Sequence, residues 1–96
     1  MGDETKGEAS IKVIKRDGTL EDYSEDKIKT VVNTAGLDSH RSEALAITVT
    51  EWIKSTGKKE VTSREIRDKV LEELKVYDES VANLFDWYEK TKENNN

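Results

Sequence analysis

Three cations lie around an expected turn and at the start of an expected helix. Lys15 and Arg16 precede the pair Asp17-Gly18, and Lys27 falls in the first turn of the helix that follows. A helix N-terminus carries partial positive charge and backbone N–H groups without intrahelical partners, so a cation there is unfavourable unless an anion binds beside it. The arrangement therefore suits phosphate binding. The plainer interpretation, that all three are solvated surface charges, stays open on these residues alone.

The element expected to hold the first two cations is a β-hairpin. Residues 11–16 include three β-branched residues, and a second short run follows at 19–23. Asp17-Gly18 between two such runs favours a two-residue type I′ turn, in which both central residues adopt positive φ.

That turn fixes an expected register. It pairs Ile14 with Glu21, and it places Leu20 on the same face as Val13. Glu21 and Tyr23 then lie on the opposite face, because side chains alternate along a strand.

Four helices are predicted after the hairpin, because apolar residues recur there every three or four positions. Suitable capping residues precede three of them: Ser24, Thr62 and Asp78. Glu65 completes a capping box with Thr62. The second helix is expected from about His40 to Thr56, and a short third strand at residues 60–62. The predicted fold class is α+β, a four-helix cluster capped by a small three-stranded sheet, in the order ββααβαα.

The aromatic residues are expected mainly in the core, and stacking of Tyr77, Phe85 or Tyr88 on a base is the alternative. The last helix is predicted to bury a stripe made of Val81, Leu84, Phe85 and Tyr88. Trp52 is also assigned to the core. Trp87 lies off the stripe and is either half exposed or part of a contact with a partner.

The composition excludes several classes of protein. The chain has 96 residues, no cysteine and a single histidine, so a disulfide framework, a Cys/His zinc site and a cysteine nucleophile are ruled out. No glycine-rich phosphate loop is present. Because no reaction is suggested by the remaining residues, a non-enzyme is expected.

The net charge, the length of the apolar runs and the composition of the chain ends give three further expectations. A formal net charge of −5 argues against direct nucleic-acid binding. No apolar run is long enough for a membrane span, and a cytoplasmic protein is expected. Residues 1–10 and 93–96 lack branched aliphatic and aromatic side chains and are expected to be disordered tails around a folded part at 11–92.

The segment from Val13 to Ile28 resembles the signature of the ATP-cone family. The matching positions are Val13, Lys15, Arg16, Asp17, Gly18, Glu21, Tyr23, Lys27 and Ile28. Two later family elements are similar to Val61-Thr62-Ser63 with Ile66, and to Ala82, Phe85 and Tyr88. The resemblance spans nearly the whole predicted folded part.

This resemblance implies a regulatory domain that binds ATP or dATP, with Mg²⁺ as an optional companion of the triphosphate. The positions that it implies for the nucleotide site are Val13, Lys15, Arg16, Glu21, Lys27, Thr62, Ser63, Arg67 and Lys90. The resemblance implies that Glu21 holds the base or the ribose, that Lys27 and Lys90 contact phosphate, and that Arg67 lies where the base is recognised. Thr62 or Ser63 joins the phosphate site.

The chain departs from the family pattern at Glu89, where the family often has arginine. A carboxylate repels a triphosphate, so either Lys90 takes the place of that arginine or the affinity for the nucleotide falls. It also lacks the cysteines of a zinc ribbon, and so does not match a complete repressor of reductase genes. The alternative hypothesis is therefore a protein-interaction or oligomerisation module that keeps the fold and has lost the ligand. Both hypotheses name a partner protein domain or a second copy as a contact.

Overall fold

Three strands and four helices follow one another in the predicted order. The computed structural model describes the backbone of residues 11–94 and the side chains of residues 11–91. The elements are β1 (Lys12–Ile14), β2 (Leu20–Asp22), α1 (Glu25–Ala35), α2 (Ser39–Thr56), β3 (Glu60–Thr62), α3 (Ser63–Tyr77) and α4 (Glu79–Asn94). The predicted α+β class is confirmed. Of the expected tails, residues 1–10 and 95–96 lie outside the described residues, and residues 93–94 complete α4.

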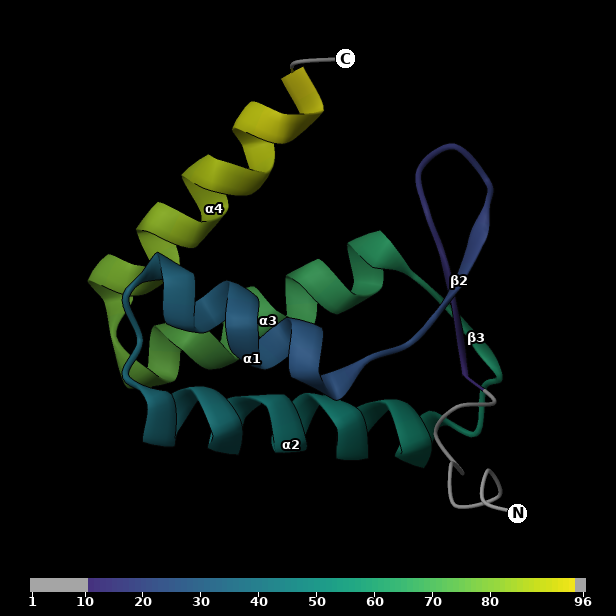
Figure 1. Cartoon of the computed structure of the whole chain (residues 1–96), viewed down its shortest axis with the longest axis horizontal. Coiled ribbons are helices and arrows are strands. Elements are labelled where there is room, and N and C mark those ends of the chain that lie inside the picture. The colour runs from purple at the N-terminus through teal and green to yellow at the C-terminus, as the bar shows by residue number, and fades with distance from the viewer. Residues whose placement is uncertain (1–10, 95–96) are drawn as a thin grey trace.

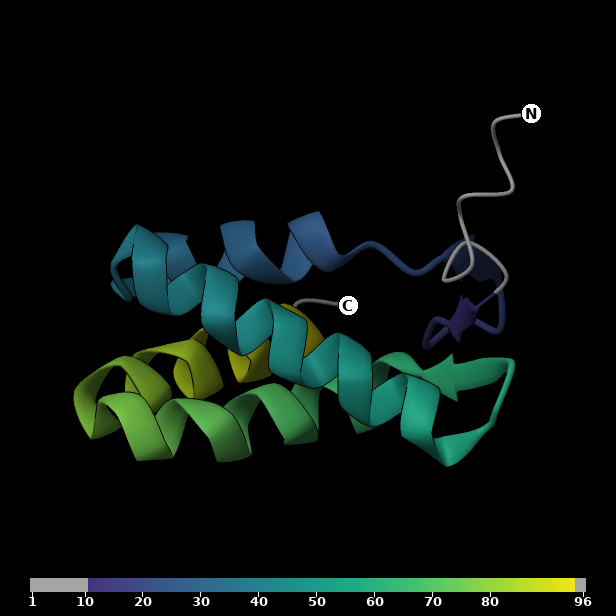
Figure 2. The same ribbon diagram turned by 90° about the horizontal axis from the view of Figure 1, so that it is seen from below.

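The small sheet lies at one end of the helices (Figure 1). Its strand order is β2-β1-β3, with β1 antiparallel to β2 and parallel to β3. The two views show α2 along one side of the cluster, packed against α1 and α3 (Figure 2). The second half of α4 extends away from the other three helices (Figure 1). None of the helices within residues 11–94 has the length and apolar composition needed to cross a membrane.

The hairpin turn differs from the expectation. Its loop has three residues, 16–18: the Lys15 N–H donates to the Thr19 carbonyl at 2.8 Å, and the Gly18 N–H donates to the Lys15 carbonyl at 2.9 Å. Gly18 has a φ of +89°, whereas no other residue type in the described chain has positive φ, so Asp17 does not adopt the type I′ conformation. The Asp17 carboxylate instead accepts the Thr19 N–H at 3.0 Å and the Thr19 hydroxyl at 2.7 Å, which stabilises this longer loop.

The extra loop residue shifts the register by one and exchanges the two faces of β2. Val13 pairs with Glu21, and Ile14 pairs with Leu20. Glu21 therefore lies on the same face as the buried Val13, which packs on the helices, and Tyr23 is buried there too. Leu20 points outward and is 54% exposed. The expectation that Leu20 shares the face of Val13, with Glu21 on the opposite face, is wrong.

The core lies between α2 and the other elements. Its most buried large side chains are Leu45, Ile53, Leu74, Val32, Val49, Val61 and Val70. The end of β2 is attached to this core by one buried polar contact, because the Tyr23 hydroxyl lies 2.7 Å from the Thr50 hydroxyl. The Thr50 hydroxyl also reaches the Ala46 carbonyl at 2.9 Å.

Two apolar residues of α4 do not enter the core. Leu84 and Tyr88 are each 50% exposed, whereas Phe85 is buried as predicted. The second half of α4 extends away from the other helices (Figure 1), and the described elements leave part of its apolar stripe uncovered. Trp87 is 60% exposed. Trp52 is only partly buried, with the Lys69 ammonium 5.6 Å from its ring centre.

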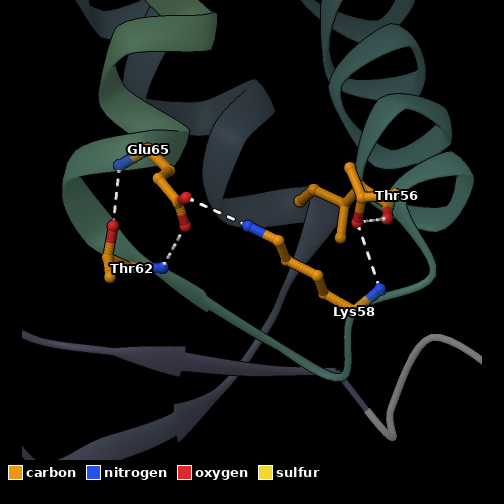
Figure 3. A network of polar contacts seen from close by, with 5 residues as sticks. Thr56, Lys58, Thr62 and Glu65 are labelled. Carbon is orange, nitrogen blue, oxygen red and sulfur yellow. Dashed lines mark hydrogen bonds and ion pairs between the residues drawn. The ribbon is translucent and has the colours of Figure 1, made fainter.

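Figure 3 shows how the start of α3 is held. The Thr62 hydroxyl accepts the Glu65 N–H at 3.0 Å, and the Glu65 carboxylate accepts the Thr62 N–H at 2.9 Å, which is the predicted capping box. The Lys58 ammonium donates to the same carboxylate at 3.3 Å, and the backbone N–H of Lys58 donates to the Thr56 hydroxyl at 3.2 Å. The end of α2 is therefore tied to the first turn of α3 across β3.

Removing the cap tests this local account. Thr62→Ala should lower the free energy of unfolding by about 1 kcal/mol, because it removes one capping acceptor. The measurement is urea unfolding followed by circular dichroism. Thr48→Ala is the matched control: its exposed hydroxyl bonds back to the Ala44 carbonyl in mid-helix, where alanine has the higher helix propensity. Equal losses in the two variants would contradict the role given to the cap.

Candidate functional site

Two adjoining hollows open between the sheet, α1, α3 and α4, with volumes of about 150 and 140 Å³. Both are lined by Lys27, Ile28, Ser63 and Ile66. Because they share these residues, we treat them as one groove. The end beside the sheet adds Val13, Glu21 and Tyr23. The end beside α4 adds Arg67, Phe85 and Glu89.

The first turns of two helices line this groove. Lys27 and Ile28 belong to the first turn of α1, and Ser63 and Ile66 to that of α3. Both turns contribute the partial positive charge of a helix N-terminus. The isoleucines add an apolar wall beside that charge. The arrangement suits a ligand with a flat apolar part and an anionic part.

Glu21 connects two cations at the sheet end of the groove. One carboxylate oxygen lies 2.8 Å from the Lys27 ammonium, and the other lies 3.3 Å from the Lys15 ammonium. These contacts, Lys27 first, lower the pKa of Glu21 below its usual value. The Glu21 side chain is 33% exposed, against 67% for Lys27 and 50% for Lys15. The carboxylate is thus the least exposed member of the three.

A second set of opposite charges lies at the other end. Arg67 lines the groove from α3, and Glu89 lines it from α4. The Arg67 side chain is 16% exposed, and its Nε lies 3.7 Å from the Asp68 carboxylate. The carboxylate that departs from the family pattern therefore lies in the groove wall itself.

Five of the nine positions implied by the resemblance line the groove: Val13, Glu21, Lys27, Ser63 and Arg67. Lys15 adjoins it through Glu21. Thr62 is not in its lining, and its hydroxyl oxygen is used by the capping box. Of the two alternatives at the start of α3, the structure brings Ser63 into the groove.

The other two implied positions, Arg16 and Lys90, also lie outside this lining. Arg16 is an exposed residue of the hairpin turn. The exposed ammonium of Lys90 lies 3.2 Å from the Asp86 carboxylate, one turn earlier in α4.

Sequence reasoning did not identify the aliphatic part of the groove's apolar wall. Ile28 and Ile66 were assigned to helix stripes facing the core, as was Phe85 in the favoured interpretation, yet each also borders the groove. Ile66 lies three residues after Ser63, and Phe85 lies four residues before Glu89. Residues at these spacings share a helix face, which is a signal that could have placed both beside the polar residues of the groove.

The match to a family model extends over this whole arrangement. The model of the ATP cone domain matches residues 11–92, and the chain belongs to the ATP-cone family. This membership indicates a nucleotide-binding regulatory role. The chain is also similar to the transcriptional repressor NrdR of Synechococcus sp. (strain RCC307), with 38% identity over 69 residues. The match covers 68% of this chain and 43% of the repressor, so the chain spans less than half the length of that relative.

The paired Glu21 carboxylate predicts an acid-sensitive contribution to stability. Because its pKa is lowered on folding, the contribution is present above the ordinary glutamate pKa of about 4.3 and is lost as the pH falls through the lowered folded-state pKa. The midpoint of thermal unfolding of Glu21→Gln should therefore fall less than that of the wild type between pH 5 and pH 3.

Asp26→Asn serves as the control, since it removes an exposed carboxylate from the first turn of α1. Thermal unfolding at several pH values provides the comparison. Identical acid sensitivity in the wild type and Glu21→Gln would contradict the ion pairs described here.

Proposed function

We propose that this chain binds ATP or dATP in the groove and acts as a regulatory sensor domain that catalyses no reaction itself. The observation that carries the proposal is the groove's combination of an apolar wall with the Lys27 ammonium and the N-terminal ends of α1 and α3. A purine ring and a phosphate chain need these two environments side by side. Family membership supports the same ligand class.

The proposed position of the ligand follows from the two halves of the groove. The purine packs against Ile28, Ile66 and Phe85, and the phosphates meet Lys27, Lys15 and Ser63. Hollows of about 150 and 140 Å³ are smaller than the roughly 300–1,000 Å³ of a typical ligand pocket. The nucleotide would thus lie partly over the surface, with room for Mg²⁺ on its outer phosphates.

The remaining implied positions complete the proposal. Arg16 in the hairpin turn and Lys90 near the end of α4 are proposed as further phosphate contacts, and Arg67 as a contact of the base. Each hydrogen bond to a charged group contributes roughly 1.5–3 kcal/mol. A micromolar dissociation constant corresponds to about 8 kcal/mol of binding free energy, and three or four such hydrogen bonds together supply an energy of that order.

The regulatory part of the proposal rests on α4. This helix lines the groove with Phe85 and Glu89, whereas Leu84, Trp87 and Tyr88 point outward. We name these last three residues the α4 apolar face. A ligand that packs on Phe85 contacts the same two turns of α4 that carry this face. Nucleotide binding can therefore change which contacts the face makes.

A second candidate function is an oligomerisation module, favoured by the exposure of the α4 apolar face. Its residues are 50%, 60% and 50% exposed, at i, i+3 and i+4 on one helix. The proposed occupant is a second copy of this chain. The face has no charged member, so two chains of net charge −5 can meet there without placing like charges in contact.

Direct nucleic-acid contact is not part of the proposal. The net charge of −5 disfavours it. We propose that this domain senses the nucleotide, and that any repressor activity like that of the relative belongs to a larger protein.

Removing both lysines beside Glu21 tests the nucleotide site. Lys15→Ala with Lys27→Ala should weaken ATP binding by about tenfold or more, because two charged contacts are lost. The measurement is isothermal titration calorimetry with ATP, and with GTP as the ligand control. Lys75→Ala, in the exposed last turn of α3, should leave affinity unchanged. An unchanged affinity in the double variant would remove these lysines from the site.

Sedimentation velocity tests the oligomerisation candidate. The wild type should show a concentration-dependent dimer whose population differs between zero and saturating ATP, and Leu84→Ser with Trp87→Ser should stay monomeric in both conditions. Val76→Ser changes an apolar residue that is 80% exposed on α3, and it should behave as the wild type. A wild type that is monomeric throughout would contradict this candidate.

A further inference from the structure

We propose that Glu89 makes the binding of a triphosphate in this groove depend on a divalent cation. This role rests on the proposed nucleotide site, and it falls to a residue at which the chain departs from the family pattern. The cation is Mg²⁺ that arrives on the phosphates of the ligand, and the protein does not hold it alone.

The lining of the groove contains more carboxylates than cations. Among the described residues, two basic side chains line it, those of Lys27 and Arg67. The acidic side chains of the lining are those of Glu21, Asp22 and Glu89. The two helix N-termini add about half a positive charge each, which only offsets the one surplus carboxylate. A metal-free triphosphate, which is strongly anionic, therefore enters a lining without an excess of positive charge.

Glu89 places a negative charge beside the proposed position of the phosphates. It lines the same hollow as Lys27 and Ser63, two of the residues proposed to meet phosphate. The next residue, Lys90, lies outside that lining, and its ammonium is 3.2 Å from the Asp86 carboxylate. A metal-free triphosphate thus meets a carboxylate at the α4 end of the groove. Like charges repel each other more strongly at the surface of a protein than in bulk water.

A carboxylate at this position suits a cation that the phosphates bring with them. Mg²⁺ takes oxygen ligands, keeps several waters and is usually bound by one or two carboxylates together with the phosphates of a ligand. Among the described residues, no group of three or more metal-ligating side chains could hold a metal ion by itself. Glu89 and a triphosphate together supply oxygen ligands of the required kind. The ion between them changes a repulsion into an attraction.

The sign of the metal effect separates Glu89 from the rest of the groove. Mg²⁺ lowers the negative charge of the nucleotide, so it weakens the attraction of the phosphates to Lys15, Lys27 and the helix N-termini. A groove with cations alone would therefore bind metal-free ATP more tightly than the Mg²⁺ complex. A carboxylate beside the phosphates reverses that order. Arginine at position 89 should restore it.

The experiment measures the ATP affinity of the full chain by isothermal titration calorimetry, once in excess Mg²⁺ and once in EDTA, at a matched ionic strength of about 0.15 M. The wild type should bind the Mg²⁺ complex about tenfold more tightly than metal-free ATP. Glu89→Gln should lose most of this preference, and Glu89→Arg should bind metal-free ATP more tightly than the complex. Glu79→Gln makes the same change of charge as Glu89→Gln at an exposed position in the first turn of α4, and it should keep the wild-type preference.

The outcomes separate this inference from the proposed function. A wild type that binds metal-free ATP as tightly as the Mg²⁺ complex overturns the inference, and this comparison holds even if a variant unfolds. One common preference in the wild type, Glu89→Gln and Glu89→Arg overturns it as well. Failure of the wild type to bind ATP in either condition overturns the proposed function. In that case a gain of metal-free ATP binding in Glu89→Gln still establishes that Glu89 excludes the bare triphosphate, and no gain overturns the inference too.

Discussion

The side of β2 on which Glu21 lies is the constraint on which the rest of the groove depends. A loop of three residues, closed by Gly18 at positive φ, sets a register in which Glu21 faces Val13 and the helices. A loop of two residues would turn Glu21 to solvent, because a shift of one residue exchanges the faces of a strand. The contacts with Lys15 and Lys27, and the charge pattern of the groove, would then be lost.

The second requirement is that two helices begin beside this carboxylate. The chain passes from β2 into α1 within three residues, and from β3 into α3 without a break. The short strands β2 and β3 therefore position the N-termini of α1 and α3 against the groove. The cap at Thr62, tied to α2 by Lys58, holds one of them. The capping box thus holds in place the first turn of α3, from which Ser63 and Ile66 line the groove.

The helices, their caps and the third strand could be predicted, because periodicity and capping are local properties of the sequence. The hairpin register could not, since Asp17-Gly18 fits both a two-residue and a three-residue loop, and hydrogen bonds from Thr19 decide between them. Apolar spacing in α4 also could not show that Leu84 and Tyr88 stay half exposed, because the extent of packing depends on the other helices. For the candidate site, the sequence indicated the cations, but choosing Ser63 over Thr62 required the geometry of the cap.

The most direct test of the central claim is an amide NMR titration of the full chain with ATP, with GTP as the control. The account predicts saturable shifts with ATP at residues 15–18, at Lys27 and at Ser63, continuing to Phe85 on α4. Absence of shifts at millimolar ATP would contradict it. Saturable shifts confined to the separate hollow beside Trp52 and Lys69 would contradict it as well, because they would place the ligand away from the two helix N-termini.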